Sequence, residues 1–207
     1  MKNGKKLAAL LLAAVMTLSL AACGGKDAEQ GNPADSSSEA ENKVADELIV
    51  LTGSDASTFD PHFCTDSATE IFNKNMYNNL VRFNADMEII PDLAESWSVS
   101  EDGLTWTFKL RSGVKFHDGT DFDASAVKTT LERLLDPDVG SPRRSVVASI
   151  ETVEVVDAST VAITTVSPNG ALLQQLAHPV GAIISPTALD TYGDDISSHP
   201  VGTGPFK

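Results

Sequence analysis

The sequence predicts a mixed α/β fold, and three observations support this prediction. Residues 104–110 alternate apolar Leu, Trp, Phe and Leu with polar residues, a period of two that is typical of a strand with one buried face. Residues 150–156 and 160–166 are rich in β-branched residues and alternate in the same way. Residues 68–78 and 124–135 carry apolar side chains at helical spacing. Strands and helices therefore follow one another along the chain.

Length and charge limit the classes of function. The chain has 207 residues, enough for one or two domains, and its hydrophobic content of 42% can form a sizeable core. The formal net charge is −14, from 29 acidic and 15 basic residues. We expect no nucleic-acid binding, because no basic stripe is present to neutralise phosphates. Cys23 and Cys64 lie in very different settings and are not expected to pair.

Residues 1–22 are typical of an export signal. Three lysines precede an apolar stretch, residues 7–20, which is too short and wrongly flanked for a stable transmembrane span. Leu-Ala-Ala then leads directly into Cys23, and this order resembles the bacterial lipobox, in which the cysteine is lipidated and becomes the new N-terminus. An ordinary signal peptide with a coincidental cysteine is the alternative. We therefore expect a protein outside the cytoplasm, anchored by lipid to the outer face of the cell membrane or lying in the periplasm.

A tether is expected after the lipidated cysteine. Residues 24–46 are rich in Gly, Ser, Asp and Glu and contain no aromatic residue. Such a segment cannot bury enough apolar surface to offset its chain entropy. Residues 23–46 are therefore interpreted as a lipid attachment point with a flexible acidic spacer, and a short helix is the alternative.

The folded part is expected to begin at residues 47–51, an apolar run that predicts a buried strand. The loop that follows contains Phe-Asp-Pro-His at residues 59–62, where Asp-Pro favours an extended or turn conformation. Asp66 or Ser67 can cap the helix predicted over residues 68–78. The chain therefore passes from a strand through a loop into a helix.

A short strand is predicted over residues 80–83, and residues 91–119 then carry the densest strand and turn signals of the chain. Trp97 and Val99 share a parity, so they can supply a strand that faces residues 104–110 across a Glu-Asp-Gly turn. These features predict a small antiparallel sheet with one buried aromatic face.

Downstream, Asp123 is expected to cap the helix over residues 124–135, and Asp-Pro ends this helix. The strands at 150–156 and 160–166 are joined as a hairpin. The remaining predicted elements are a helix that ends at His178 and Pro179, a short buried strand at Ile183 and Ile184, and a helix from Pro186 to about Tyr192.

The last residues hold two glycines and two prolines before Phe206 and Lys207, which have the pattern of a strand that is beginning. A compact domain rarely stops on an opening strand. We therefore expect a fragment or a truncated gene product.

Short catalytic and metal-binding motifs are missing from the sequence. The four histidines are widely spaced, and none forms an HExxH pair or a similar arrangement. No GxSxG, P-loop or GxGxxG sequence occurs, and the carboxylates are scattered. We expect no enzyme activity, no catalytic residues, no cofactor and no metal site.

Residues 63–67 are the strongest binding candidate on local grounds. They follow a predicted strand and precede a helix N-terminus, where open α/β sheets bind ligands and where free N–H groups attract anions. Arg143 and Arg144 could also meet an anionic ligand group bidentately, with a solvated pair as the alternative.

An ordered set of segments resembles one protein family. The segments are residues 59–62 (FDPH), 91–97 (PDLAESW), 102–108 (DGLTWTF), 110–111 with 113–119 (LR and GVKFHDG), 155–157 (VVD) and 202–206 (GTGPF). Together they are similar to the extracellular solute-binding proteins of ABC transporters, in the family 5 group that includes oligopeptide-, dipeptide- and nickel-binding proteins. The resemblance covers essentially all of residues 48–207.

The resemblance implies a periplasmic-binding-protein-like α/β lobe of the class II type with an inserted accessory α+β domain. Residues 47–78 and 179–207 would form the main lobe, and residues 79–178 the accessory domain. The usual second lobe would follow Lys207 and is missing from this chain. In such proteins a ligand is trapped between the lobes by hinge closure and is delivered to a membrane permease.

The resemblance also implies a ligand site. In peptide-binding members, the loop after Asp-Pro-His runs along the bound peptide, and the segment after a Ser-Pro pair approaches the cleft. The residues implicated in this chain are Cys64, Thr65, Asp66, Ser67 and Arg143.

The sequence thus predicts the substrate-binding component of an ABC importer, a monomer that binds peptides outside the membrane, mainly through main-chain hydrogen bonds, and hands them to a permease. A nickel–chelator complex, haem or an oligosaccharide on the same scaffold is the alternative. A secreted hydrolase is disfavoured, since no nucleophile or metal motif is present.

Overall fold

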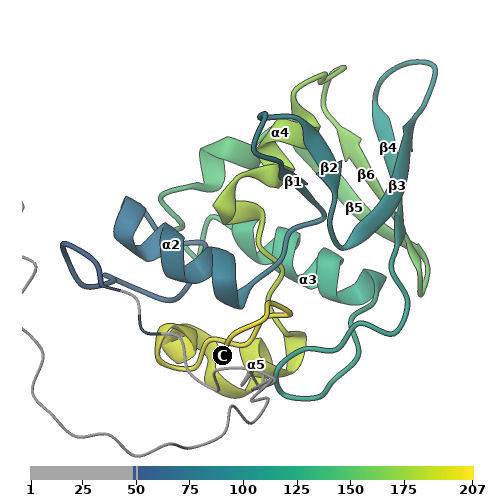
Figure 1. Ribbon diagram of the computed structural model, residues 1–207. Coiled ribbons are helices and arrows are strands. Elements are labelled where there is room, and N and C mark those ends of the chain that lie inside the picture. Colours follow the sequence, from purple (N-terminus) through teal and green to yellow (C-terminus); the bar gives the residue numbers. More distant parts are fainter. Residues whose placement is uncertain (1–48, 50) are drawn as a thin grey trace, which may run out of the picture. The chain divides into compact units, whose positions relative to one another are not determined.

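A computed structural model of the chain describes residue 49 and residues 51–207 (Figure 1). The expected export signal, the lipidation of Cys23 and the acidic tether lie outside the described residues. Within the part that is described, no helix is both long enough and apolar enough to cross a membrane.

Helix α2 (Ser67–Met76) begins where the sequence predicts. The carboxylate of Asp66 accepts a hydrogen bond from the backbone N–H of Thr69 at 2.9 Å, and so it satisfies one of the free donors at the helix start. The helix ends at Tyr77, whose extended backbone stops the helical repeat. Of the two predicted caps, Asp66 is therefore confirmed, and Ser67 is the first residue of the helix.

A two-stranded antiparallel sheet, β1 (Val81–Phe83) with β2 (Ile89–Pro91), follows this helix. The turn between the strands places Met87 at a φ of 62°, a backbone conformation that non-glycine residues rarely adopt. Strand β1 confirms the strand predicted at residues 80–83. Strand β2 was not predicted, because its three residues are too few to show a periodic pattern.

The second sheet of the described region has four antiparallel strands in the order β3-β4-β6-β5 (Figure 1). The strands are β3 (Ala94–Val99), β4 (Thr105–Leu110), β5 (Ile150–Asp157) and β6 (Thr160–Thr165). Both predicted hairpins are present, and Gly103 has the positive φ of 72° that its turn requires. Pairing between β4 and β6, with Trp106 opposite Ile163, joins the two hairpins.

Helix α3 (Ala124–Leu135) covers one face of this sheet, against β5 and β6 (Figure 1). The buried aromatic face that the sequence predicts is present in Trp106 and Phe108, which pack in one core with Leu131 of the helix. Val99 lies opposite Trp106 and so is on the same face, as expected, but it is 47% exposed because β3 is an edge strand and this residue lies at its end.

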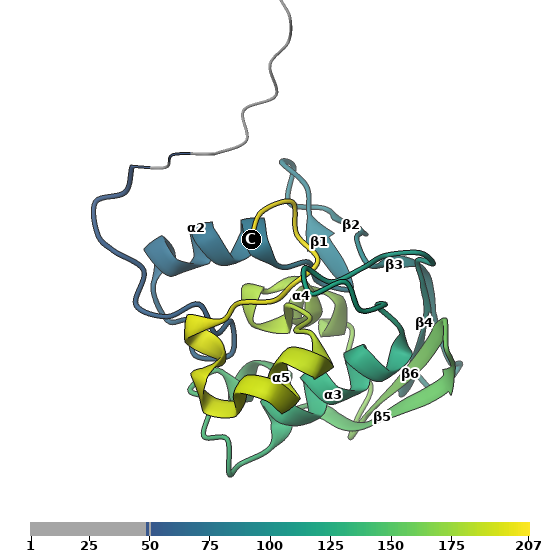
Figure 2. The ribbon, with the colours of Figure 1, turned by 90° about the horizontal axis from the view of Figure 1, so that it is seen from below.

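Short helical segments complete the described region, and α3 lies between the four-stranded sheet and α5 (Figure 2). These segments are η1 (Arg144–Val147), α4 (Leu172–Ala177), η2 (Pro179–Gly181), α5 (Pro186–Tyr192) and η3 (Gly193–Ser198). Helices α4 and α5 confirm the predicted helices. Residues 141–143 form the loop that enters η1.

Three predicted strands are wrong where the structure describes them. Ile49 and Leu51 are 76% and 94% exposed and have no strand partner in the described residues. Ile183 and Ile184 are fully buried but not in a sheet, because their N–H groups bond to a carbonyl of a loop and to the Thr130 hydroxyl. Phe206 is also outside any strand.

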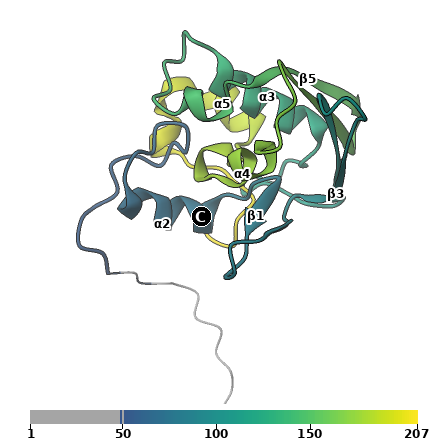
Figure 3. The same ribbon diagram turned by 90° about the horizontal axis from the view of Figure 1, so that it is seen from above.

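Residues 201–206 instead pack along the C-terminal end of α2 (Figures 2 and 3). The N–H groups of Gly204 and Phe206 donate to the carbonyl oxygens of Met76 and Asn75 at 2.9 and 3.1 Å. On the other side, Nε2 of His117 lies 2.7 Å from the carbonyl oxygen of Gly204. The segment around His117 thus holds the C-terminal residues.

Replacing Asp123 with alanine is expected to lower the free energy of unfolding by about 1 kcal/mol. Its carboxylate caps α3 by accepting bonds from the N–H groups of Ser125 and Ala126, at 2.9 and 3.1 Å. Urea denaturation followed by circular dichroism measures the change. Asp190→Ala, at an exposed position of α5, serves as the control and should change stability by less than about 0.5 kcal/mol.

Candidate ligand-binding site

The loop before α2 is packed tightly onto that helix. Phe59 meets Phe72 edge to face, with ring centroids 6.1 Å apart. The hydroxyl of Tyr77, a buried residue, donates to the carbonyl oxygen of Phe59 at 3.1 Å. These contacts fix the entrance of the loop that the sequence analysis selected.

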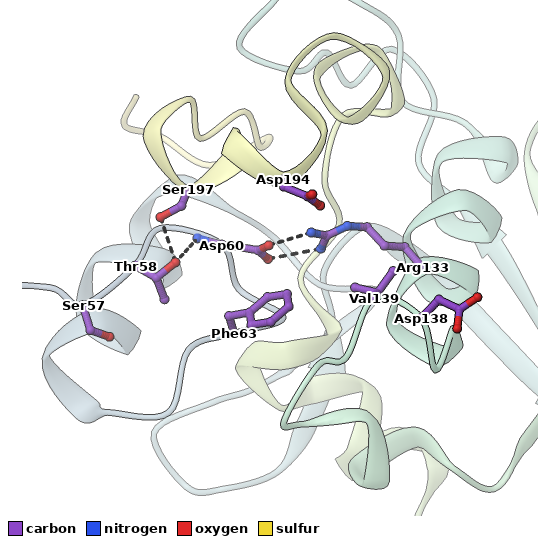
Figure 4. Close-up of a pocket in the computed structure, with 9 residues that line it drawn as sticks. All are labelled: Ser57, Thr58, Asp60, Phe63, Arg133, Asp138, Val139, Asp194 and Ser197. Carbon is purple, nitrogen blue, oxygen red and sulfur yellow. Dashed lines mark hydrogen bonds and ion pairs between the residues drawn. The ribbon is translucent and has the colours of Figure 1, made fainter.

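A buried ion pair lies at the centre of this loop (Figure 4). Arg133 of α3 donates from its two Nη atoms to the two carboxylate oxygens of Asp60, at 3.2 and 2.7 Å. The side chains are only 14% and 5% exposed. Such a bidentate pair fixes the relative orientation of the two groups as well as their distance.

The same guanidinium determines the tautomer of His62. Nη1 of Arg133 lies 2.8 Å from Nδ1 of His62, and arginine can only donate, so Nδ1 accepts and the proton is on Nε2. His62 is fully buried, and within the described residues Nε2 has no partner. Burial lowers the pKa of His62 from 6.5 to about 3, with a further decrease from Arg133, while the carboxylate of Asp60 opposes the shift. The imidazole is therefore neutral at physiological pH.

The structure brings together two of the site residues that the sequence predicts. Nε of Arg143 donates to the carbonyl oxygen of Cys64 at 3.0 Å. Two residues earlier in the loop, the carbonyl oxygen of His62 accepts a hydrogen bond from the hydroxyl of Ser141 at 2.6 Å. The segment before η1 therefore lies along the loop.

Cys64 itself is buried, and its thiol donates to the carbonyl oxygen of Asp66 at 3.5 Å. Burial raises the pKa of this thiol, so it is neutral at pH 7 and a poor nucleophile. It forms no disulfide within the described residues. Any contact that Cys64 makes with a ligand would therefore use its backbone.

The other predicted residues divide into two kinds. The carboxylate of Asp66 is occupied, since it caps α2 and accepts a bond from the hydroxyl of Ser57 at 2.6 Å. Hydrogen bonds from Ser57 and then Thr69 lower the pKa of Asp66 and keep it ionised. The side chains of Thr65 and Ser67 are exposed and can meet another molecule.

A cavity of about 630 Å³ lies beside the Asp60–Arg133 pair (Figure 4). Its lining residues are Ser57, Thr58, Asp60, Phe63, Arg133, Asp138, Val139, Asp194 and Ser197. The sequence analysis missed Arg133, although a charged residue between the core positions Leu131 and Leu134 was a usable signal. A second cavity, of about 590 Å³, includes Glu70, Lys74 and His178 in its lining.

The described residues contain no group of three His, Cys, Asp or Glu side chains placed to hold a metal ion. The groups around the loop instead suit hydrogen bonding to a polar ligand, because exposed hydroxyls, backbone groups and a guanidinium lie close together. The imidazole of His62 and the thiol of Cys64 are both neutral, and they do not provide an activated nucleophile.

Acid is expected to destabilise the fold through His62. Below about pH 6.5 the unfolded chain binds a proton at this residue, whereas the folded chain does not until about pH 3, so unfolding is favoured as the pH falls. His62→Gln should reduce the slope of unfolding free energy against pH by up to about 1.4 kcal/mol per pH unit between about pH 4.5 and 6. Urea denaturation of both proteins at several pH values measures it. Equal slopes would show that His62 is protonated normally in the fold.

Comparison with known proteins identifies the family. The profile described as "Bacterial extracellular solute-binding proteins, family 5 Middle" matches residues 88–207. The glutathione-binding protein GsiB of Salmonella paratyphi A is 46% identical over 164 residues, which are 79% of this chain and 32% of that protein.

Solved structures give the same result for the fold, and they confirm the predicted fold class. The periplasmic binding protein AgaA of A. tumefaciens R10, in complex with agropinic acid, has a TM-score of 0.70 and 37% identity, covering 74% of this chain and 31% of AgaA. Helicobacter pylori DppA, in complex with the peptide STSA, has a TM-score of 0.69 and 33% identity, covering 75% and 35%. The chain thus spans about a third of the length of these relatives. It belongs to family 5 of the bacterial extracellular solute-binding proteins.

Proposed function

We propose that the protein is the substrate-binding component of an ABC importer, which binds peptides outside the membrane and delivers them to the permease. One observation carries this proposal: the similarity to GsiB and to DppA, whose ligands, glutathione and STSA, are both short peptides. It performs no chemistry on the ligand. AgaA, with agropinic acid, supports a second candidate, a non-peptide ligand on the same scaffold.

The ligand would lie along the loop before α2. The residues proposed to meet it are Cys64, Thr65, Asp66, Ser67 and Arg143. Thr65 and Ser67 are exposed, and the backbone of Cys64 lies next to Arg143, whose Nη atoms could bind a carboxylate or carbonyl group of a peptide. Main-chain hydrogen bonds would supply affinity with little dependence on side-chain identity.

The domain division follows from the same proposal. Residues 47–78 and 179–207 would belong to the main lobe, and residues 79–178 to an accessory domain. Lipidation of Cys23 and the tether up to residue 46 would hold a monomer at the outer face of the membrane. The ligand would be trapped by hinge closure against a second lobe.

Isothermal titration calorimetry on the full-length protein that the gene encodes tests the proposal. Titration with STSA and with glutathione is expected to give micromolar or tighter binding of at least one of them. Arg143→Met should weaken that binding about 10-fold or more, as expected when a charged hydrogen bond is lost. Lys128→Met removes a half-exposed cation of α3 that is bonded to Glu132 and to the carbonyl oxygen of Val153, away from the loop, and it should leave binding unchanged.

The controls separate the alternatives. Nickel–histidine, haem and a maltooligosaccharide belong in the same panel. Heat with one of these, and none with either peptide, would replace the peptide proposal with the second candidate. Turnover of a peptide or ester substrate would contradict a purely binding role.

A further inference from the structure

We propose that Arg133, Ser141 and Arg143 act together as a clamp that positions the ligand-binding loop. The clamp is defined by these three side chains, and the loop by residues 60–66, which precede α2. The inference rests on the proposed function, since it assigns a task to residues beside the proposed site. Arg133 and Ser141 would be positioning residues that need not touch the ligand.

The three side chains hold three alternate residues of the loop, Asp60, His62 and Cys64. Arg133 holds the carboxylate of Asp60 with two hydrogen bonds. Ser141 donates to the carbonyl oxygen of His62 at 2.6 Å, and Arg143 donates to that of Cys64 at 3.0 Å.

The three anchors are also joined to one another. The hydroxyl of Ser141 accepts a bond from the backbone N–H of Arg143 at 3.1 Å, and Arg133 donates to the imidazole of His62 at 2.8 Å. Loss of one anchor is therefore expected to loosen its neighbours, because groups in one network are coupled energetically.

Burial makes the first anchor strong. Phe63 lies between the held residues, with its ring centroid 6.0 Å from the guanidinium carbon of Arg133. The ring lies beside the ion pair (Figure 4), and the carboxylate of Asp60 is almost completely buried. Since water is largely excluded, the charge-assisted bonds are stronger than those of an exposed pair.

The opposite end of the loop is held from α2. Asp66 caps that helix, and its second carboxylate oxygen accepts a bond from the Thr69 hydroxyl at 2.8 Å. The loop is thus fixed from both sides, by α2 and by the clamp. A loop that is ordered before binding spares the ligand the cost of ordering it, and this increases affinity.

The clamp also crosses the expected domain boundary. The loop belongs to the proposed main lobe, whereas Arg133, Ser141 and Arg143 all belong to the proposed accessory domain. The accessory domain would therefore contribute to binding by setting the shape of a loop in another domain, a role that needs few direct ligand contacts from it.

Two mild variants test the clamp in the longest product of the gene. Arg133→Lys keeps the charge but cannot make the bidentate contact, and Ser141→Ala removes a single hydroxyl. Lys128→Met, at a half-exposed position of α3 whose polar contacts are with Glu132 and Val153 and not with the loop, is the control. Hydrogen exchange is followed at the N–H groups of His62 and Phe63, which both bond to Asp60, and at those of β4.

In both variants the loop amides are expected to exchange at least about 5-fold faster, while the β4 amides keep their rates. The dissociation constant for STSA or glutathione should rise about 5-fold or more, and saturating ligand should restore protection of the loop. The control should match the wild type in every measurement.

Three results would overturn the clamp. The first is unchanged exchange of the loop amides, and the second is acceleration that extends equally to β4, which would mean a general loss of stability. The third is a loosened loop with unchanged peptide binding. Wild-type protein that binds neither probe would instead refute the proposed function, and exchange alone would then decide whether the clamp orders the loop.

Discussion

Asp60→Asn is expected to lower the free energy of unfolding by about 3–5 kcal/mol, the largest effect of any single polar substitution that we predict. The carboxylate neutralises Arg133 at a site where both side chains are almost completely excluded from water. Asparagine has nearly the same size, so the change leaves the guanidinium in place without its counter-charge. Urea denaturation at pH 7 measures the loss.

An exposed ion pair provides the matched control. Lys115 and Asp121 lie 2.6 Å apart with side chains 59% and 76% exposed. Asp121→Asn should cost less than about 1 kcal/mol, because water and side-chain freedom compensate for the lost pair. The double variant Asp60→Asn with Arg133→Met should be more stable than Asp60→Asn alone, since it removes the unpaired buried charge. Equal costs for Asp60→Asn and Asp121→Asn would contradict the buried pair.

Gly202→Ala is expected to destabilise the fold by about 3 kcal/mol or more. A Cβ atom at this position would overlap the carbonyl oxygen of Met76 and lie 2.6 Å from Cδ1 of Tyr77. The nearest obstacle is backbone at the end of α2, which cannot rotate away as a flexible side chain could. Thermal unfolding of the variant should show a clear decrease in Tm.

Gly170 gives the comparison for this substitution. A Cβ atom there would have no neighbour within 4 Å, and its backbone has no positive φ that would oppose a side chain. Gly170→Ala should therefore change stability by less than about 1 kcal/mol. If Gly202→Ala changed stability as little as Gly170→Ala does, residues 201–206 would not lie as close to α2 as the structure shows.

Elements with strong local signals were predictable from the sequence. The alternation at residues 104–110 and the Gly103 turn placed the β3–β4 hairpin correctly, and Asp66 and Asp123 marked both helix starts. In these cases the residues that determine the structure lie within a few positions of each other, so the pattern itself contains the information.

Long-range contacts were not predictable in this way. Asp60 and Arg133 lie 73 positions apart, and nothing in the local sequence of either residue identifies the other. Ile183 and Ile184 have the composition of a buried strand, but single hydrogen bonds to distant groups satisfy their backbone instead. Burial was predicted correctly there, and the conformation was not.

The candidate site also combines residues that the local sequence identifies with residues that only long-range contacts reveal. Local sequence selected residues 63–67, because they precede a capped helix. Arg143 was assigned through the family resemblance, and its contact with Cys64 spans 79 positions. The buried network of Arg133 and His62, which underlies the loop, needed the three-dimensional structure.

The packing of residues 201–206 against α2 has a consequence for the order in which the chain folds. Helix α2 is made early in synthesis, yet the hydroxyl of Thr203 bonds to Asn78, 125 positions before it, and Gly204 and Phe206 complete the end of the helix. Until those residues emerge, a nascent chain lacks these partners of the C-terminal end of α2. Closing so long a loop is slow, and this end of α2 should therefore be among the last parts of the chain to acquire its native neighbours.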